Sequence, residues 1–268
     1  MKAKGDKWSK LETEARPILD DILNRWEKLI HREKVREQQV HQFLQTHAHL
    51  FFRNTYDFCT VISKLRFGAD FVSDFVAVYD CRSEGVHYHL IELERPDVPP
   101  FTKEGIASSK LSRAIQQVLS WKTWLHEHPA EAGKLFPSAS RLFGGRTSFS
   151  YEILIGTRTN TGAWTERRNV LADSLNIKIR SLDSLSDRLK DPIGFDDYSR
   201  VADEEIKRSL DERNKLACPF LEALIDPQWR ELINGKRHPY HITHHFCDEL
   251  IKLRIANRYL NRFRKLAK

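Results

Sequence analysis

The sequence lacks the features that mark secreted, membrane-spanning or nucleotide-binding proteins. Its 268 residues include only four cysteines and no CxxC pair, which is typical of reduced thiols rather than of a disulfide framework. The N-terminus has no apolar core of a signal peptide, and no apolar run is long enough to cross a membrane. There is no P-loop, no GxGxxG motif, no internal repeat and no low-complexity tract. We therefore expect a cytoplasmic globular protein that makes no membrane contact.

Positive charge exceeds negative charge. The formal net charge is +7 and the pI is near 9.2, in a chain that is 40% hydrophobic and 30% charged. Cationic surfaces gain affinity for nucleic acid because binding releases condensed counterions. Many basic proteins bind no nucleic acid, so charge alone leaves a polyanionic partner open.

Carboxylates gather at the ends of two apolar stretches. Alternation over residues 71–79 places Asp74 among the apolar side chains of one face, and alternation over residues 86–94 puts Glu92 and Glu94 on a common face. Acids brought close together raise one another's pKa values unless a cation balances them. Hard oxygen ligands without histidine or thiolate favour Mg²⁺ or Mn²⁺. The pattern therefore predicts a divalent-metal site and phosphodiester chemistry.

The periodicity of the chain predicts an α/β fold. Helical spacing of apolar residues is found over residues 11–30 and about 34–46, and again over residues 109–127. Residues 60–67 and 71–79 read as a hairpin that turns at 68–70. Further elements are predicted as a strand at 149–156, a helix at 164–176, a short strand at 177–182 and a helix at 183–189. Residues 129–147 lack periodicity and are expected to form an exposed loop. A strand, helix and strand of this length form the crossover that parallel pairing requires.

These motifs together resemble the PD-(D/E)xK nuclease superfamily. The likeness rests on Asp74 in one strand, Glu92-Leu93-Glu94 in the next, and a helix that carries Gln117 and Trp121. More narrowly, the chain resembles the Shedu (SduA) domain of bacterial anti-phage defence nucleases over about residues 36–190. The resemblance implies a PD-(D/E)xK-like mixed sheet flanked by helices. It also implies a divalent-metal-dependent endonuclease that acts on DNA.

The resemblance assigns a role to each site residue. Asp74 and Glu92 would bind Mg²⁺ or Mn²⁺, and Gln117 would form a hydrogen bond near the metal or its water. Glu94 occupies the position where most members carry a lysine, so it would act as a base or a third ligand, or would disable catalysis. Glu37 lies near the place of an additional acid in related nucleases, and we expect it to be a solvated charge.

We divide the chain into an N-terminal helical extension (1–35), a nuclease domain (36–190) and a C-terminal helical basic region (191–268). Basic residues recur at helical spacing near the C-terminus. This stripe is expected either to contact nucleic-acid phosphates or to form a solvated face, and it consists of Arg254, Arg258, Arg262 and Lys265.

Two further questions stay open at this point. Residues 238–247 hold four histidines and Cys247, and ordinary histidines are a better interpretation than a zinc site because paired close spacings are missing. The alternatives to a nuclease are a catalytically inactive nucleic-acid-binding member of the same fold and an oligomeric scaffold. For the working nuclease we expect DNA and further copies of the chain as partners.

Overall fold

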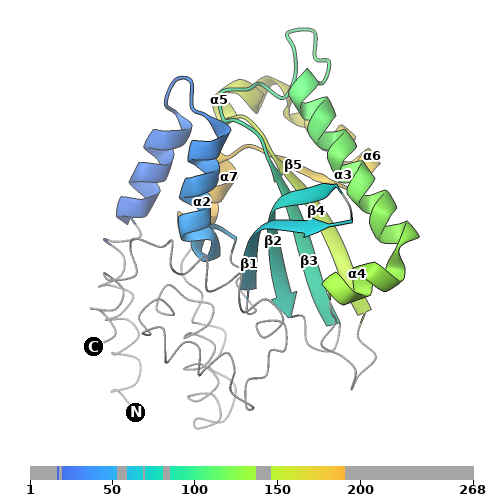
Figure 1. Ribbon diagram of the computed structural model, residues 1–268. Helices are drawn as coiled ribbons and strands as arrows, with labels where there is room; N and C mark the ends of the chain where they lie inside the picture. Colours follow the sequence, from blue (N-terminus) through green and yellow to red (C-terminus); the bar gives the residue numbers. More distant parts are fainter. Residues whose placement is uncertain are drawn as a thin grey trace, which may run out of the picture.

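The described part of the chain is built around a five-stranded mixed sheet (Figure 1). The computed structural model describes residues 17, 20–52, 59–68, 70–80, 85–136 and 146–190. The strand order is β1-β2-β3-β4-β5, with antiparallel pairing among β1, β2 and β3 and parallel pairing from β3 to β5. The predicted α/β fold with a mixed sheet flanked by helices is confirmed.

The strands lie close to their predicted positions. Their bounds are β1 (Cys59–Phe67), β2 (Phe71–Asp80), β3 (Gly85–Leu93), β4 (Arg146–Leu154) and β5 (Lys178–Arg180). The hairpin of β1 and β2 turns at Gly68, whose φ of 62° lies in the left-handed region that glycine adopts without strain. This turn fixes which residues of β1 and β2 stand opposite each other.

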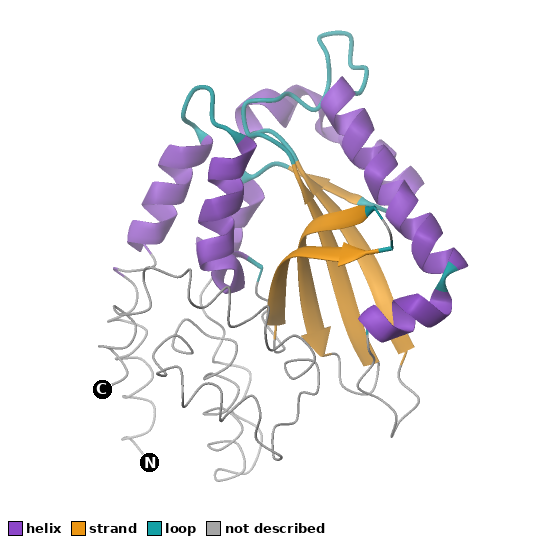
Figure 2. Ribbon diagram, viewed as in Figure 1, coloured by secondary structure: helices purple, strands orange, loops and turns teal. Residues whose placement is uncertain are grey.

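Helices cover both faces of the sheet (Figure 2). The helix over residues 20–30, α2 (Glu37–Phe51) and α7 (Asp183–Lys190) pack on one face. The other face carries α3 (Ser109–Glu127), α4 (Pro129–Leu135) and α6 (Thr165–Leu175), the last preceded by α5 (Arg158–Thr161) and the turn η2 (Gly162–Trp164). Helices α3 and α6 belong to the two crossovers that parallel pairing requires. None of the described helices is long and apolar enough to cross a membrane.

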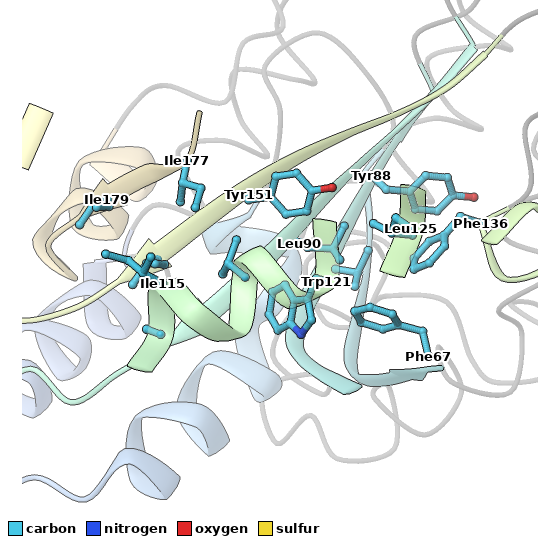
Figure 3. Packing of buried hydrophobic residues seen from close by; sticks show 14 of the residues in the cluster. Phe67, Tyr88, Leu90, Ile115, Trp121, Leu125, Phe136, Tyr151, Ile177 and Ile179 are labelled. Carbon is cyan, nitrogen blue, oxygen red and sulfur yellow. The ribbon is translucent and has the colours of Figure 1, made fainter. Parts of the chain in front are cut away.

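Alternation of side chains along the strands produces two hydrophobic cores. In β2, Phe75 faces the layer of α2 and α7, whereas Val76 faces α3. The core on the α3 side is shown in Figure 3, where Trp121 points into the cluster. Trp121 is fully buried, and its ring centroid lies 5.8 Å from that of Phe67 in an edge-on contact. Trp121 is therefore a core residue that anchors α3 on the sheet.

Helix α3 occupies the predicted residues because both its start and its buried face are specified locally. Ser108 Oγ accepts a hydrogen bond from Leu111 N at 3.3 Å and satisfies one of the free N–H groups of the first turn. The buried positions recur every three or four residues and are Leu111, Ala114, Ile115, Val118, Trp121 and Leu125. The opposite side of the helix remains available for polar contacts.

The expected loop at 129–147 is wrong in its first part. Residues 129–135 form α4, with Pro129 in the first turn, and Ala132 and Phe136 are buried against the core beneath α3. A helix of seven residues spans only two turns, which is too short to produce a readable period. Residues 137–145 lie outside the described part of the chain.

Candidate active site

The β2–β3 ladder ends at a pair of acids. The antiparallel register pairs Phe75 with Ile91, so Asp74 and Glu92 are the next residues on their strands. Asp74 Oδ2 accepts a hydrogen bond from Leu93 N at 2.8 Å, so the carboxylate takes up a main-chain donor where the ladder stops. Asp74 is 5% exposed and Glu92 is 8% exposed. Two neighbouring carboxylates are thus buried at one end of the sheet.

Glu94 completes an acidic trio with Asp74 and Glu92. Its main-chain N–H donates to Leu154 O at 2.8 Å, which holds the residue against β4 directly beyond the end of β3. Lys110 Nζ, from the first turn of α3, lies 3.4 Å from Glu94 Oε2. That oxygen is buried and accepts no hydrogen bond, so the contact with Lys110 is a charge attraction without hydrogen-bond alignment. Glu94 therefore retains acceptor capacity within the site.

Helix α3 brings an amide to the acids. Gln117 Nε2 donates to Glu92 Oε2 at 2.8 Å and lies 3.5 Å from Val72 O. The first contact restricts the orientation of the Glu92 carboxylate, and the second fixes the amide against the edge of β2. The structure therefore brings all four predicted site residues, Asp74, Glu92, Glu94 and Gln117, to one end of the sheet.

Burial and neighbouring negative charges raise the proton affinity of Glu92 and Glu94. Burial raises the pKa of Glu92 to about 9, and the charges of Asp74 and Glu94 add to the effect. Burial also raises the pKa of Glu94, while the ammonium of Lys110 opposes that increase. Buried acids of this kind lose their protons readily only when a cation balances the charge. A cation bound beside Glu92 and Glu94 would favour their ionised forms.

A fourth acid comes from α2. Glu37 stands in the first turn of that helix, and burial together with the charge of Asp74 raises its pKa. Its own charge contributes to the raised pKa of Glu92 and of Glu94. The expectation of a freely solvated charge at Glu37 is therefore corrected: the side chain is half-buried and lies within electrostatic reach of the trio.

Two lysines face these acids, and the sequence reasoning singled out neither. Lys64 of β1 forms an ion pair with Asp74 Oδ1, while Lys110 approaches Glu94. The Lys64 side chain is 51% exposed and that of Asp74 is 6% exposed, so the lysine reaches inward from the rim of the site. The hairpin register was a usable signal for Lys64, because a turn at 68–70 places residue 64 opposite residue 74.

The donor set suits a hard divalent cation. When all four carboxylates and both ammonium groups are ionised, the excess is two negative charges, which equals the charge of one Mg²⁺ or Mn²⁺. Within the described residues, no group of three or more histidine, cysteine or acidic side chains is arranged so that it could hold a metal ion, so a cation here would rest on fewer than three protein ligands. Mg²⁺ usually takes one or two carboxylates and completes its shell with water and substrate phosphate oxygens. Asp74 and Glu92 fit this requirement as ligands.

A separate polar network crosses the opposite face of the sheet. His87 Nε2 and His89 Nδ1 lie 2.7 Å and 2.6 Å from Ser150 Oγ, and His89 Nε2 lies 2.8 Å from Glu152 Oε2. Arg188 of α7 donates to both oxygens of Glu152, at 2.8 Å and 3.0 Å. Burial opposes ionisation of Glu152, but Arg188 and His89 hold its pKa down to about 2. The network joins β3, β4 and α7 through a buried charge.

The remaining predicted sites cannot be placed. The basic stripe of Arg254, Arg258, Arg262 and Lys265 lies outside the described residues, as does the histidine cluster at 238–247. Their proposed contacts with nucleic acid or zinc stay predictions.

Comparison with known families gives one match. The family model described as "Shedu protein SduA, C-terminal" matches residues 34–186, which is more than half of the 268 residues. The matched segment contains the acidic trio, Gln117 and both lysines described above. Comparison with curated proteins finds no match.

Proposed function

This chain belongs to the Shedu SduA C-terminal family of anti-phage defence proteins, and from that premise we propose that it is a divalent-metal-dependent endonuclease acting on DNA. One observation carries the proposal. Asp74, Glu92 and Glu94 are buried together at one end of the sheet, and carboxylate oxygens are the ligands that Mg²⁺ and Mn²⁺ prefer in metal-dependent phosphodiester hydrolysis.

Each residue of the site has a role in this proposal. Asp74 and Glu92 hold Mg²⁺ or Mn²⁺, which when bound neutralises charge on the scissile phosphate and lowers the pKa of a water. Gln117 holds Glu92 Oε2 in position through the hydrogen bond of 2.8 Å. Glu94 accepts a proton from the attacking water or serves as a third ligand, and burial raises the pKa of Glu94, which strengthens it as a base.

The positive charge of the chain supports a polyanionic substrate. With a formal net charge of +7, the protein would attract DNA from a distance and bind its backbone without regard to sequence. We assign this contact to the C-terminal basic stripe of Arg254, Arg258, Arg262 and Lys265. The functional unit in this proposal is a homo-oligomer that acts in the cytoplasm.

The test is a cleavage assay on linear, nicked and supercoiled DNA, with Mg²⁺, with Mn²⁺ and with neither. The wild type is expected to cut DNA only with metal, and Asp74→Asn is expected to lose cleavage because it loses the ligand charge. Asp70→Asn is the matched control, since Asp70 is an exposed acid at the turn of the same hairpin. A wild type that leaves all three DNA forms intact with both metals would contradict the proposal.

The carboxylate at position 94 favours one alternative function. Without the usual lysine, the chain would be a catalytically inactive member that binds nucleic acid and does not cut it. Retained DNA affinity combined with no cleavage in the same assay would establish this alternative. Failure to bind either metal or DNA would instead point to an oligomeric scaffold.

A further inference from the structure

Lys64 has an unusual backbone for its place in a strand. Within β1, Ser63 pairs with Phe75 and Leu65 pairs with Ser73, so Lys64 stands opposite Asp74. Its φ is 53°, in the left-handed region, and it is the only non-glycine residue of the described strands with a positive φ. A residue with a side chain typically loses about 1–2 kcal/mol in this conformation. An interaction or a function of the Lys64 side chain must therefore offset this backbone strain.

The ion pair of Lys64 with Asp74 stabilises the fold too little to offset the backbone strain at Lys64. Its ammonium contacts Asp74 Oδ1, but half of the lysine side chain is exposed to solvent. Ion pairs with an exposed partner typically stabilise a protein by only about 0–1 kcal/mol. The strain at Lys64 is therefore at least as large as the expected gain. Strained residues of this kind are concentrated at functional sites.

The ammonium of Lys64 lies beside one oxygen of the Asp74 carboxylate. Asp74 Oδ2 is held by Leu93 N at 2.8 Å, so the Lys64 contact falls on the other oxygen of a proposed metal ligand. The resemblance places a charged donor at position 94, where this chain has a buried carboxylate. Lys110 lies beside that carboxylate at 3.4 Å and offsets its charge. Lys64 therefore contacts the proposed metal ligand Asp74 while about half of its side chain is exposed to solvent.

We propose that Lys64 is a catalytic residue that donates an N–H to a non-bridging oxygen of the scissile phosphate. This inference rests on the proposed nuclease function and deepens it. Water forms the new bond to phosphorus, the bond from phosphorus to one ester oxygen breaks, the proton of the water passes to Glu94 or to solvent, and the leaving oxygen takes up a proton from water. Lys64 keeps its proton throughout and stabilises the charge that develops on the phosphate.

The test compares Lys64→Met and Lys64→Arg with Lys178→Met, a matched control from an exposed lysine of β5. The readouts are single-turnover DNA cleavage, calorimetric Mg²⁺ and Mn²⁺ affinity, and thermal unfolding. Lys64→Met is expected to lower the cleavage rate by about 10²–10³-fold, the loss typical of one transition-state donor. Its metal affinity should be unchanged or tighter, because an ammonium that competes for Asp74 has been removed. Lys64→Arg should keep part of the rate, and Lys178→Met should match the wild type.

Several outcomes would overturn the inference. If Lys64 has only a structural role, Lys64→Met will cut DNA within about threefold of the wild type, or it will lose cleavage rate, metal affinity and folding together. Either result would refute a catalytic Lys64, as would a variant Lys110→Met that loses the rate while Lys64→Met keeps it. A wild type that cuts no DNA would refute the nuclease function itself, so the two failures are distinguishable.

Discussion

Replacement of Glu152 by glutamine isolates the energetic contribution of the buried network on the face opposite the acidic site. Glu152 is 0% exposed and is held by Arg188 and His89. Glutamine keeps the shape of the side chain and removes its charge. We predict that Glu152→Gln makes the protein less sensitive to acid, and that the difference from the wild type depends on pH in a defined window.

The window follows from the pKa of Glu152, which is lowered from 4.5 to about 2. A group with a depressed folded pKa contributes stability that is present above its unfolded pKa and is lost as pH falls through the folded pKa. Since one pKa unit corresponds to about 1.4 kcal/mol, the ionised side chain contributes about 3 kcal/mol, of which about 2 kcal/mol is lost between about pH 6 and about pH 3.

The assay is denaturant unfolding of both proteins across this window. The free energy of unfolding of the wild type minus that of Glu152→Gln should fall by about 2 kcal/mol from about pH 6 to about pH 3. Groups that titrate alike in both proteins cancel in this difference. Glu166→Gln, which changes an exposed acid of α6, should show no such pH dependence relative to the wild type. A difference that stays constant across the window would refute the ionised Glu152.

Three further predictions concern the proposed function. In the wild type, the folded pKa of Glu92 is raised from 4.5 to about 9, so the free energy of unfolding of the metal-free protein falls as pH rises above about 4.5. Glu92→Gln removes this loss and should stabilise the metal-free protein at about pH 8 relative to the wild type. Thermal unfolding of both proteins at about pH 5 and about pH 8 checks this. If Glu94 is a ligand or base, Glu94→Ala should abolish cleavage as thoroughly as Asp74→Ala. If Glu94 instead disables catalysis, the wild type will be inactive and Glu94→Lys will restore cleavage. A gel assay of DNA cleavage separates these cases. Deletion of residues 251–268 should weaken DNA binding and reduce its salt dependence, as measured by fluorescence anisotropy; an unchanged slope would identify a solvated face.

The trio of acids was predictable because each step needed only local information. Period-two alternation assigned Asp74, Glu92 and Glu94 to faces of their strands, and the turn at 68–70 set the hairpin that precedes β3. The bounds of α3 were predictable for the same reason, since its apolar period and its Ser108 cap both lie within the segment. The short helix α4 was missed because two turns carry too little periodicity.

The sequence by itself determined the α/β class, the strand and helix pattern and the acids that meet at the end of the sheet, because these depend on residues near one another in the chain. Only the tertiary structure decided which charges surround those acids. Glu37 comes from α2 and Lys110 from α3, and their approach to the acids depends on how separate elements pack, whereas the position of Lys64 opposite Asp74 follows from the hairpin register. Electrostatic balance is a property of that packing, so the raised pKa of Glu92 and the position of Lys110 follow from the fold and not from any motif.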